Sequence, residues 1–237
     1  MPPPPTPPRP QWPIPKFSLR IEDLSHPGVK LFLQSVDPHK VMVDACTSVF
    51  QWLYGTVEVA PKNVQEIHLV LRPMEGVAYT TGTHTHKQIH LSCQHIVNNT
   101  SRARHEIYGV LTHEVVHCFQ YNAKGSCPGG FVEGIADWVR LHASLSPPHW
   151  QPRSGPQWDA GYDTTAYFLA WLEDRFGSHV VPTLNEFMND KKYDEKMFGE
   201  VTGSGMTVEE LWSEYCASVD KGGVRRDGKG ALVVQER

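Results

Sequence analysis

The sequence predicts an α+β fold, because the spacing at which apolar residues recur changes once along the chain. Apolar residues alternate in several short stretches of the first 96 residues, as they do in half-buried strands. After residue 103 they recur every three or four residues, which is typical of amphipathic helices. We therefore expect a short mixed sheet near the N-terminus and a mostly helical C-terminal half.

Four strands and six helices follow from these patterns. The first helix is indicated by Val41, Ala45 and Val49, which share one helical face. Asparagine, threonine and serine side chains at 98–101 are expected to cap the helix that follows them. The expected strands are 17–21, 67–71, 77–80 and 88–96. The expected helices are 38–54, 103–121, 131–145, 163–176, 180–190 and 208–219.

The two ends of the chain differ in composition from its centre. Nine of the 19 prolines lie in residues 1–15, which predicts a disordered, extended arm. A ligand for a proline-recognition domain is the alternative for this arm. Residues 220–237 are rich in glycine and charge and are expected to form a flexible tail. Residues 16–219 then form a single domain, because about 200 residues is an ordinary domain size.

Charge and hydropathy exclude two classes of partner. The formal net charge is −4 and the pI is about 6.3, so no basic field is available for nucleic acid or for an anionic membrane surface. No apolar run is long enough to predict a transmembrane helix. The sequence gives no indication of the oligomeric state.

The cysteines and the N-terminus bear on localisation. Five scattered cysteines without a CxxC pair are a poor disulfide framework and predict reduced thiols. Residues 1–15 lack the apolar core of a secretory signal. Both observations favour a cytoplasmic protein.

The most informative motif is HEVVH at residues 113–117, inside an expected helix. His113 and His117 are four residues apart, so both imidazoles lie on one helix face and can bind a single Zn²⁺. Glu114 lies beside them and is suited to act as general base on a zinc-activated water. A chain of this composition contains such a motif by chance only about 0.04 times, which favours a metal site over two partly exposed helix histidines.

A third zinc ligand is expected on the next helix. Glu133 and Asp137 are four residues apart and share a helix face, and a glycine-rich turn separates them from the HEVVH motif. Glu133 would complete a His/His/Glu set, leaving the fourth position open as catalytic zinc requires. Asp137 would hold the outer N–H of a ligating histidine, His113 in the first instance. A ligand role for Asp137 is the alternative.

The strand that precedes the HEVVH helix completes the pattern. In zinc peptidases of this architecture, an edge strand beside the metal pairs with the extended substrate through its backbone. Residues 88–96 occupy that place in the order strand, cap, helix. We therefore expect 88–96 to be the edge strand that binds the substrate.

These residues together predict a zinc metallohydrolase, in the first instance a peptidase acting on peptide or protein substrates. Glu114 would take a proton from water and pass it to the leaving amine. A non-catalytic zinc-containing binding protein and a hydrolase of a non-peptide amide or ester are the alternatives. The intact Glu114 favours an enzyme, because a structural zinc site does not need a base.

Several longer blocks resemble the plant basic secretory protein family, a peptidase-like family of plants and bacteria. The blocks are HEVVH (113–117), PGGFVEGIADWVR (128–140), WDAGYDTTA (158–166), LWSEY (211–215) and the pair GVAY (76–79) and IHLS (89–92). The family is similar to glutamate-zincins, so the resemblance implies a zincin-like metallopeptidase fold. It also implies secretion, against the cytoplasmic expectation above.

The resemblance suggests Tyr162 as the residue that stabilises the developing oxyanion. Enzymes of this chemistry need a hydrogen-bond donor aimed at that oxygen, and Tyr162 lies in the block that follows the ligand helix. An aromatic ring packed on a helix start is the alternative for this residue.

Overall fold

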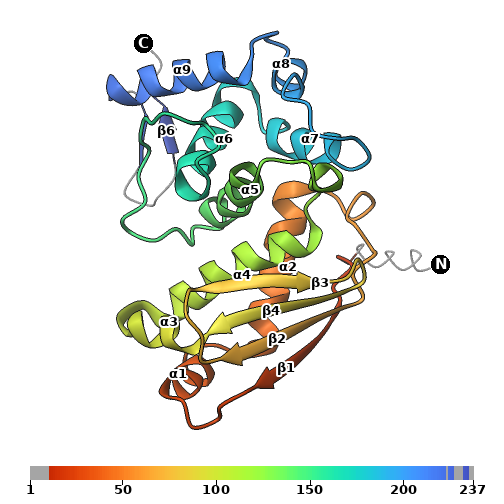
Figure 1. Ribbon diagram of the computed structural model, residues 1–237, viewed down its shortest axis with the longest axis vertical. Helices are drawn as coiled ribbons and strands as arrows, with labels where there is room; N and C mark the ends of the chain where they lie inside the picture. The colour runs from red at the N-terminus through yellow and green to blue at the C-terminus, as the bar shows by residue number, and fades with distance from the viewer. Residues whose placement is uncertain (1–10, 223, 227–231, 235–237) are drawn as a thin grey trace, which may run out of the picture.

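The computed structural model describes residues 11–222, 224–226 and 232–234. A four-stranded sheet and the helices packed on it form one half of the molecule, and a group of helices forms the other (Figure 1). The sheet has the order β1-β2-β4-β3. Strands β1, β2 and β4 are parallel to one another, whereas β3 runs antiparallel to β4, so the sheet is mixed as predicted. The strands are β1 (Lys16–Ile21), β2 (Glu66–Arg72), β3 (Ala78–Gly82) and β4 (His86–Ser92).

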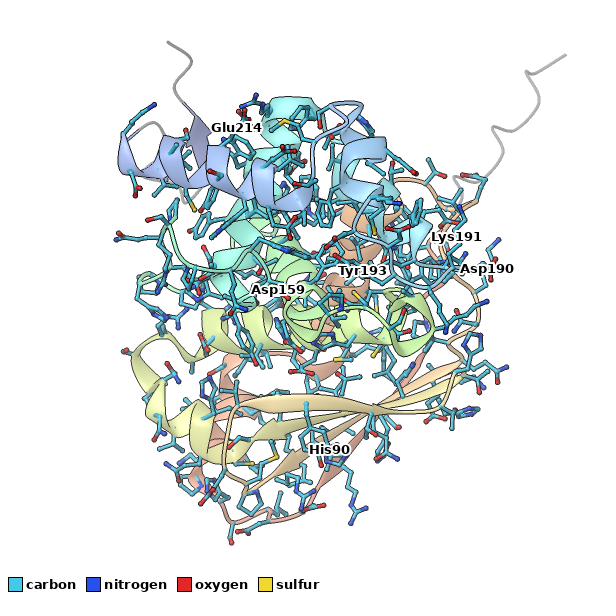
Figure 2. The ribbon with its side chains drawn as sticks, turned by 45° about the horizontal axis from the view of Figure 1, so that its top comes forward. His90, Asp159, Asp190, Lys191, Tyr193 and Glu214 are labelled. Atoms are coloured by element: carbon cyan, nitrogen blue, oxygen red, sulfur yellow. The ribbon has the colours of Figure 1, made fainter. Side chains whose placement is uncertain are left out.

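The two faces of the sheet differ, as the alternating sequence predicts. Ile67, Leu69 and Ile89 point to the inner face and are at most 2% exposed. The opposite face is polar, and there Tyr79 of β3 stacks on its cross-strand partner His90 with ring centroids 4.5 Å apart. Figure 2 shows His90 on this side of the sheet, away from the helices. The inner face therefore provides the hydrophobic core of this half.

The first two helices of the N-terminal half begin at capped positions. Helix α1 (Pro27–Ser35) and helix α2 (Pro38–Leu53) both start with proline, which suits the first helical position because it lacks an N–H group. The Asp37 side chain accepts a hydrogen bond from the backbone N–H of Lys40 and so caps α2. Helix α4 (Ala103–Phe119) packs on α2 and on β3, and it is the longest helix of the described chain.

The C-terminal half is mostly helical. Helix α5 (Gly129–His142) packs on both α4 and α6 and so joins the two halves. Two glycines permit its close approach to the following segment: Cβ atoms at Gly130 and Gly134 would lie 1.8 Å from the Asp159 carbonyl oxygen and 2.3 Å from Thr165 Cγ2. The helices after α5 are α6 (Tyr162–Phe176), α7 (Val180–Phe187), α8 (Met197–Thr202) and α9 (Val208–Asp220).

The structure corrects the predicted strand 88–96 in two ways. Strand β4 ends at Ser92, whose side chain accepts a hydrogen bond from the His95 N–H and caps a short helix, α3 (Cys93–Asn98). Strand β4 is also internal, because β3 pairs with its far side. The edge strand next to α4 is therefore β3, and the expectation that 88–96 forms this edge was wrong.

Other departures concern short elements and caps. Helices α1 and α8 were not predicted. The chain enters α4 through a 3₁₀ turn, η1 (Thr100–Arg102), and no side chain at 98–101 caps α4. Strands β5 (Val224–Arg226) and β6 (Leu232–Val234) pair antiparallel inside the segment expected to be a flexible tail. Most of the expected proline-rich arm, residues 1–10, lies outside the described residues.

Two further sequence expectations concern the thiols and the membrane. All five cysteines are free, and Cys118 is buried at 4% exposure. Within the described part of the chain, no helix combines the length and the apolar character that crossing a membrane requires.

The start of α5 provides a test of this packing. We expect Gly130→Ala to lower the free energy of unfolding by about 1–3 kcal/mol, because its Cβ would overlap the carbonyl of Asp159, which Figure 2 labels. The matched control is Gly129→Ala, since a Cβ there meets no atom within 4 Å. Urea unfolding of the two variants measures the difference, and equal losses would contradict the packing argument.

Candidate metal centre

Helix α4 brings its two histidines together at the middle of the molecule. His113 and His117 are one helical turn apart, and their Nε2 atoms are 3.1 Å apart. The helix is buried on nearly all sides, since Leu111, Val115 and Val116 are all fully buried. His113 is itself only 8% exposed. The packing of the core around α4 therefore fixes the positions of the two imidazoles.

Glu133 of α5 completes a cluster of three donor atoms. Its Oε2 lies 3.0 Å from His113 Nε2 and 3.6 Å from His117 Nε2. Two ligands 2.0–2.1 Å from a tetrahedral ion are about 3.3 Å apart, which matches all three separations. Among the described residues, this is the one group of histidine, cysteine and carboxylate side chains that converges in this way. The donor set and its spacing therefore fit zinc.

Asp137 binds the other nitrogen of His113. Its Oδ1 lies 2.6 Å from Nδ1, and the carboxylate is 2% exposed. This hydrogen bond places a proton on Nδ1 and turns Nε2 toward the cluster. Asp137 therefore contacts His113 from outside the group formed by His113, His117 and Glu133.

The charges around the cluster favour a positive charge at its centre. Burial by itself lowers the pKa of His113, but the charge and hydrogen bond of Asp137, followed by Glu133 and Glu114, raise it to about 10. Burial raises the pKa of Glu133, but hydrogen bonds from His113 and His117 hold it well below its usual range. A bound cation would take the place of the extra proton on His113.

Glu114 stands next to the cluster without joining it. Its carboxylate is 5% exposed, and its Oε2 lies 2.7 Å from the hydroxyl of Thr80 on β3. Both residues line the same cleft as the histidines. The structure therefore provides a carboxylate that lies close to the group of His113, His117 and Glu133 and is held by a separate element. Sequence reasoning did not find Thr80, because no local pattern marks the strand residue that faces a helix far along the chain.

Tyr162 lies over the cluster at the start of α6. Its ring is nearly parallel to that of His113, with centroids 6.3 Å apart, and the residue is 58% exposed. Its φ is +49°, an uncommon value for a residue with a Cβ, and such strain is concentrated at functional sites. The charge of Glu133, followed by burial, raises the pKa of the Tyr162 hydroxyl, so the hydroxyl stays protonated at neutral pH.

One cleft of about 800 Å³ contains all of these groups. Val77, Ala78, Tyr79 and Thr80 of the β3 region form one side of it. The cleft is also lined by Glu106, Arg140 and Trp150, which the sequence analysis did not identify as site residues. The spacing of Glu106, Val110, His113 and His117 at three and four residues was the available signal, since it places Glu106 on the active face of α4.

A buried ionic network includes Glu106 and Arg140. The Glu106 carboxylate accepts hydrogen bonds from His95 at 2.8 Å, from Arg140 at 3.3 Å and from Arg102. Arg140 belongs to α5 and is 7% exposed. Its guanidinium also lies over the ring of Trp150, 5.1 Å from the centroid. The network therefore joins α4 to α5 two turns before the cluster of His113, His117 and Glu133.

One comparison with known proteins identifies a family for this chain. A family model described as peptidase of plants and bacteria matches residues 14–215. This match confirms the resemblance drawn from the sequence blocks. No curated protein and no solved structure matches the chain.

The Glu106 network gives a prediction for stability against pH. Burial raises the pKa of Glu106, but the hydrogen bond from His95 and the charges of Arg140 and Arg102 outweigh it and lower this pKa to about 2. A carboxylate with a lowered pKa stabilises the fold above its unfolded pKa, and this contribution is lost as pH falls toward 2. We expect Glu106→Gln to cost about 3 kcal/mol at pH 7.

Urea unfolding between pH 2 and 8 tests this expectation. The difference between wild type and Glu106→Gln should shrink as pH falls from about 5 to 2, because over that range the Glu106 carboxyl takes up a proton in the unfolded state but stays charged in the folded state. Glu75→Gln, an exposed loop glutamate, is the control and should change little. A difference that stays constant with pH would show that the charge of Glu106 is not what stabilises the network.

Proposed function

Because this chain belongs to the family of peptidases of plants and bacteria, we propose that it is a zinc-dependent metallopeptidase. The observation that carries the proposal is the convergence of His113, His117 and Glu133 at tetrahedral spacing beside a separate glutamate. We further propose residues 16–219 as the catalytic domain, with a zincin-like fold. The family description implies peptide or protein substrates.

The proposed zinc ligands are His113, His117 and Glu133. Their three donor atoms supply two neutral nitrogens and one carboxylate oxygen, a set that zinc accepts in hydrolases. Asp137 orients His113 through Nδ1. When bound, zinc supplies Lewis acidity, which polarises the scissile carbonyl and lowers the pKa of a water molecule.

The chain's own residues perform the proton transfers in this proposal. Glu114 accepts the proton of the attacking water and delivers it to the nitrogen of the leaving amine. The Thr80 hydroxyl contacts Oε2 of its carboxylate, which leaves Oε1 for the water. The protonated hydroxyl of Tyr162 donates to the developing oxyanion, and its high exposure on the cleft side permits it to swing toward that oxygen.

Strand β3 is the proposed docking edge for the substrate. It lies at the end of the sheet, it borders the cleft, and it packs on the helix that carries the histidines (Figure 1). An extended peptide paired with this edge would pass directly over the cluster. The role that the sequence analysis gave to 88–96 therefore passes to β3.

The first prediction from this proposal concerns the ligands. Purified protein should contain close to one zinc per chain, and His113→Ala or Glu133→Ala should lose it, because two protein ligands rarely retain zinc. Asp137→Asn should weaken zinc affinity by only about 10–100-fold, since it affects the orientation of a ligand. Metal analysis and chelator competition measure both effects. Stoichiometric zinc in a His113/His117 double variant would exclude this site.

The second prediction separates an enzyme from a binding protein. Glu114→Gln should fold and retain zinc, because all three ligands are intact. Its hydrolysis of a broad peptide library should fall by about 10²–10⁴-fold, with the loss in kcat rather than in KM. Full activity in this variant would contradict the role of Glu114 as base.

The substrate range of the wild-type protein, measured in the same experiment, tests the two alternative functions. If zinc-loaded wild type cuts esters or small amides but no peptide, the alternative of a non-peptide hydrolase takes over. If it cuts no substrate of any of these classes, the chain is a zinc-containing binding protein.

A further inference from the structure

The backbone N–H and C=O groups of β3 point alternately to β4 and to the free edge of the sheet. The Ser92 N–H donates to the Val77 carbonyl, and the Thr83 N–H donates to the His86 carbonyl. In an antiparallel pair, residues alternate between pairing with the neighbour strand and pointing away from it. The odd-numbered residues from 77 to 83 therefore pair with β4. The N–H and C=O groups of Ala78 and Thr80 point to the free edge, which borders the cleft.

The side chain of Thr80 points in a different direction from its backbone groups. It faces α4, and its hydroxyl lies 2.7 Å from Oε2 and 3.0 Å from the backbone carbonyl oxygen of Glu114. Both of these atoms are acceptors, so the hydroxyl donates its hydrogen to one or shares it between them. A hydrogen bond to a carboxylate is among the stronger kinds in proteins.

We propose that Thr80 is a positioning residue that couples peptide docking on the β3 edge to the orientation of Glu114. One residue carries both contacts: its main chain faces the place of the substrate backbone, and its hydroxyl holds the base. A peptide that pairs with this edge fixes the position of Thr80 and, through Oε2, the direction of Oε1. The inference rests on the proposed function, because it assigns Glu114 as the base.

The test compares three substitutions on one strand. Thr80→Val keeps the β-branched shape and removes the hydroxyl, Thr80→Ser keeps the hydroxyl, and Thr81→Val makes the same change on an exposed side chain of the opposite face. We expect Thr80→Val to lose about 10- to 100-fold in kcat at nearly unchanged KM, since small misplacements of reacting groups cost this much. Thr80→Ser and Thr81→Val should stay within about 3-fold of wild type.

Two readouts distinguish positioning from a structural role. Zinc content should be equal in all variants, because Thr80 touches no proposed ligand. A crystal structure of Thr80→Val should show the Glu114 carboxylate turned from its wild-type position. Unchanged kcat, equal losses in Thr80→Val and Thr81→Val, or an undisplaced carboxylate would each overturn the proposal. Thr80→Ala removes the same hydroxyl and replaces Thr80→Val if valine prevents folding.

The outcomes also separate this inference from the proposed function. If wild type with bound zinc hydrolyses no peptide, the proposed function fails. The crystallographic comparison of Glu114 in wild type and Thr80→Val still decides whether Thr80 holds the carboxylate. If wild type is active and Thr80→Val is equally active, only the coupling fails.

Discussion

The buried hydrogen bond between His113 and Asp137 joins the two halves of the molecule. Helix α4 belongs to the half that contains the sheet, and α5 belongs to the helical half. A second buried link, between Glu106 and Arg140, joins the same two helices farther along. Both links need the helices to be close, and Gly109 permits this, because a Cβ there would lie 2.5 Å from Arg140 Nε. The cleft is therefore bounded by the interface between α4 and α5, called the seam below. The His113–Asp137 and Glu106–Arg140 contacts of this interface fix its shape.

The same seam concentrates negative charge. Glu114, Asp137 and Glu133 surround two imidazoles, and the first two carboxylates are almost fully buried. Buried carboxylates are costly unless hydrogen bonds or cations compensate them. At the far end Arg140 and Arg102 compensate Glu106. Near the histidines, the charge of Arg140 reaches Asp137, and further positive charge comes from His113 itself. A cation held by His113, His117 and Glu133 would supply further positive charge here.

Local sequence was sufficient for the parts of the site that lie on one helix. The spacing of His113 and His117, and of Glu133 and Asp137, follows from 3.6 residues per turn, so their faces could be predicted. The long helices could be predicted from the same spacing, and the strands from the two-residue alternation of their apolar side chains. Strand order could not, because it depends on pairing between distant segments, and residues 88–96 were therefore placed at the edge. Thr80 and Arg140 were missed because their importance arises only from contacts across the fold.

The position of the cluster on the seam has a mechanical consequence. Two of the proposed zinc ligands come from α4 and the third from α5, so zinc would cross-link the two halves as the Asp137 and Glu106 links do. Binding to the folded state alone stabilises that state by mass action. Any motion that opened the seam would also draw Glu133 away from the histidines and weaken metal binding. If zinc binds there, metal occupancy and cleft geometry would be thermodynamically linked, and the linkage would be reciprocal. A site within α4 alone could not couple chemistry to the shape of the cleft in this way.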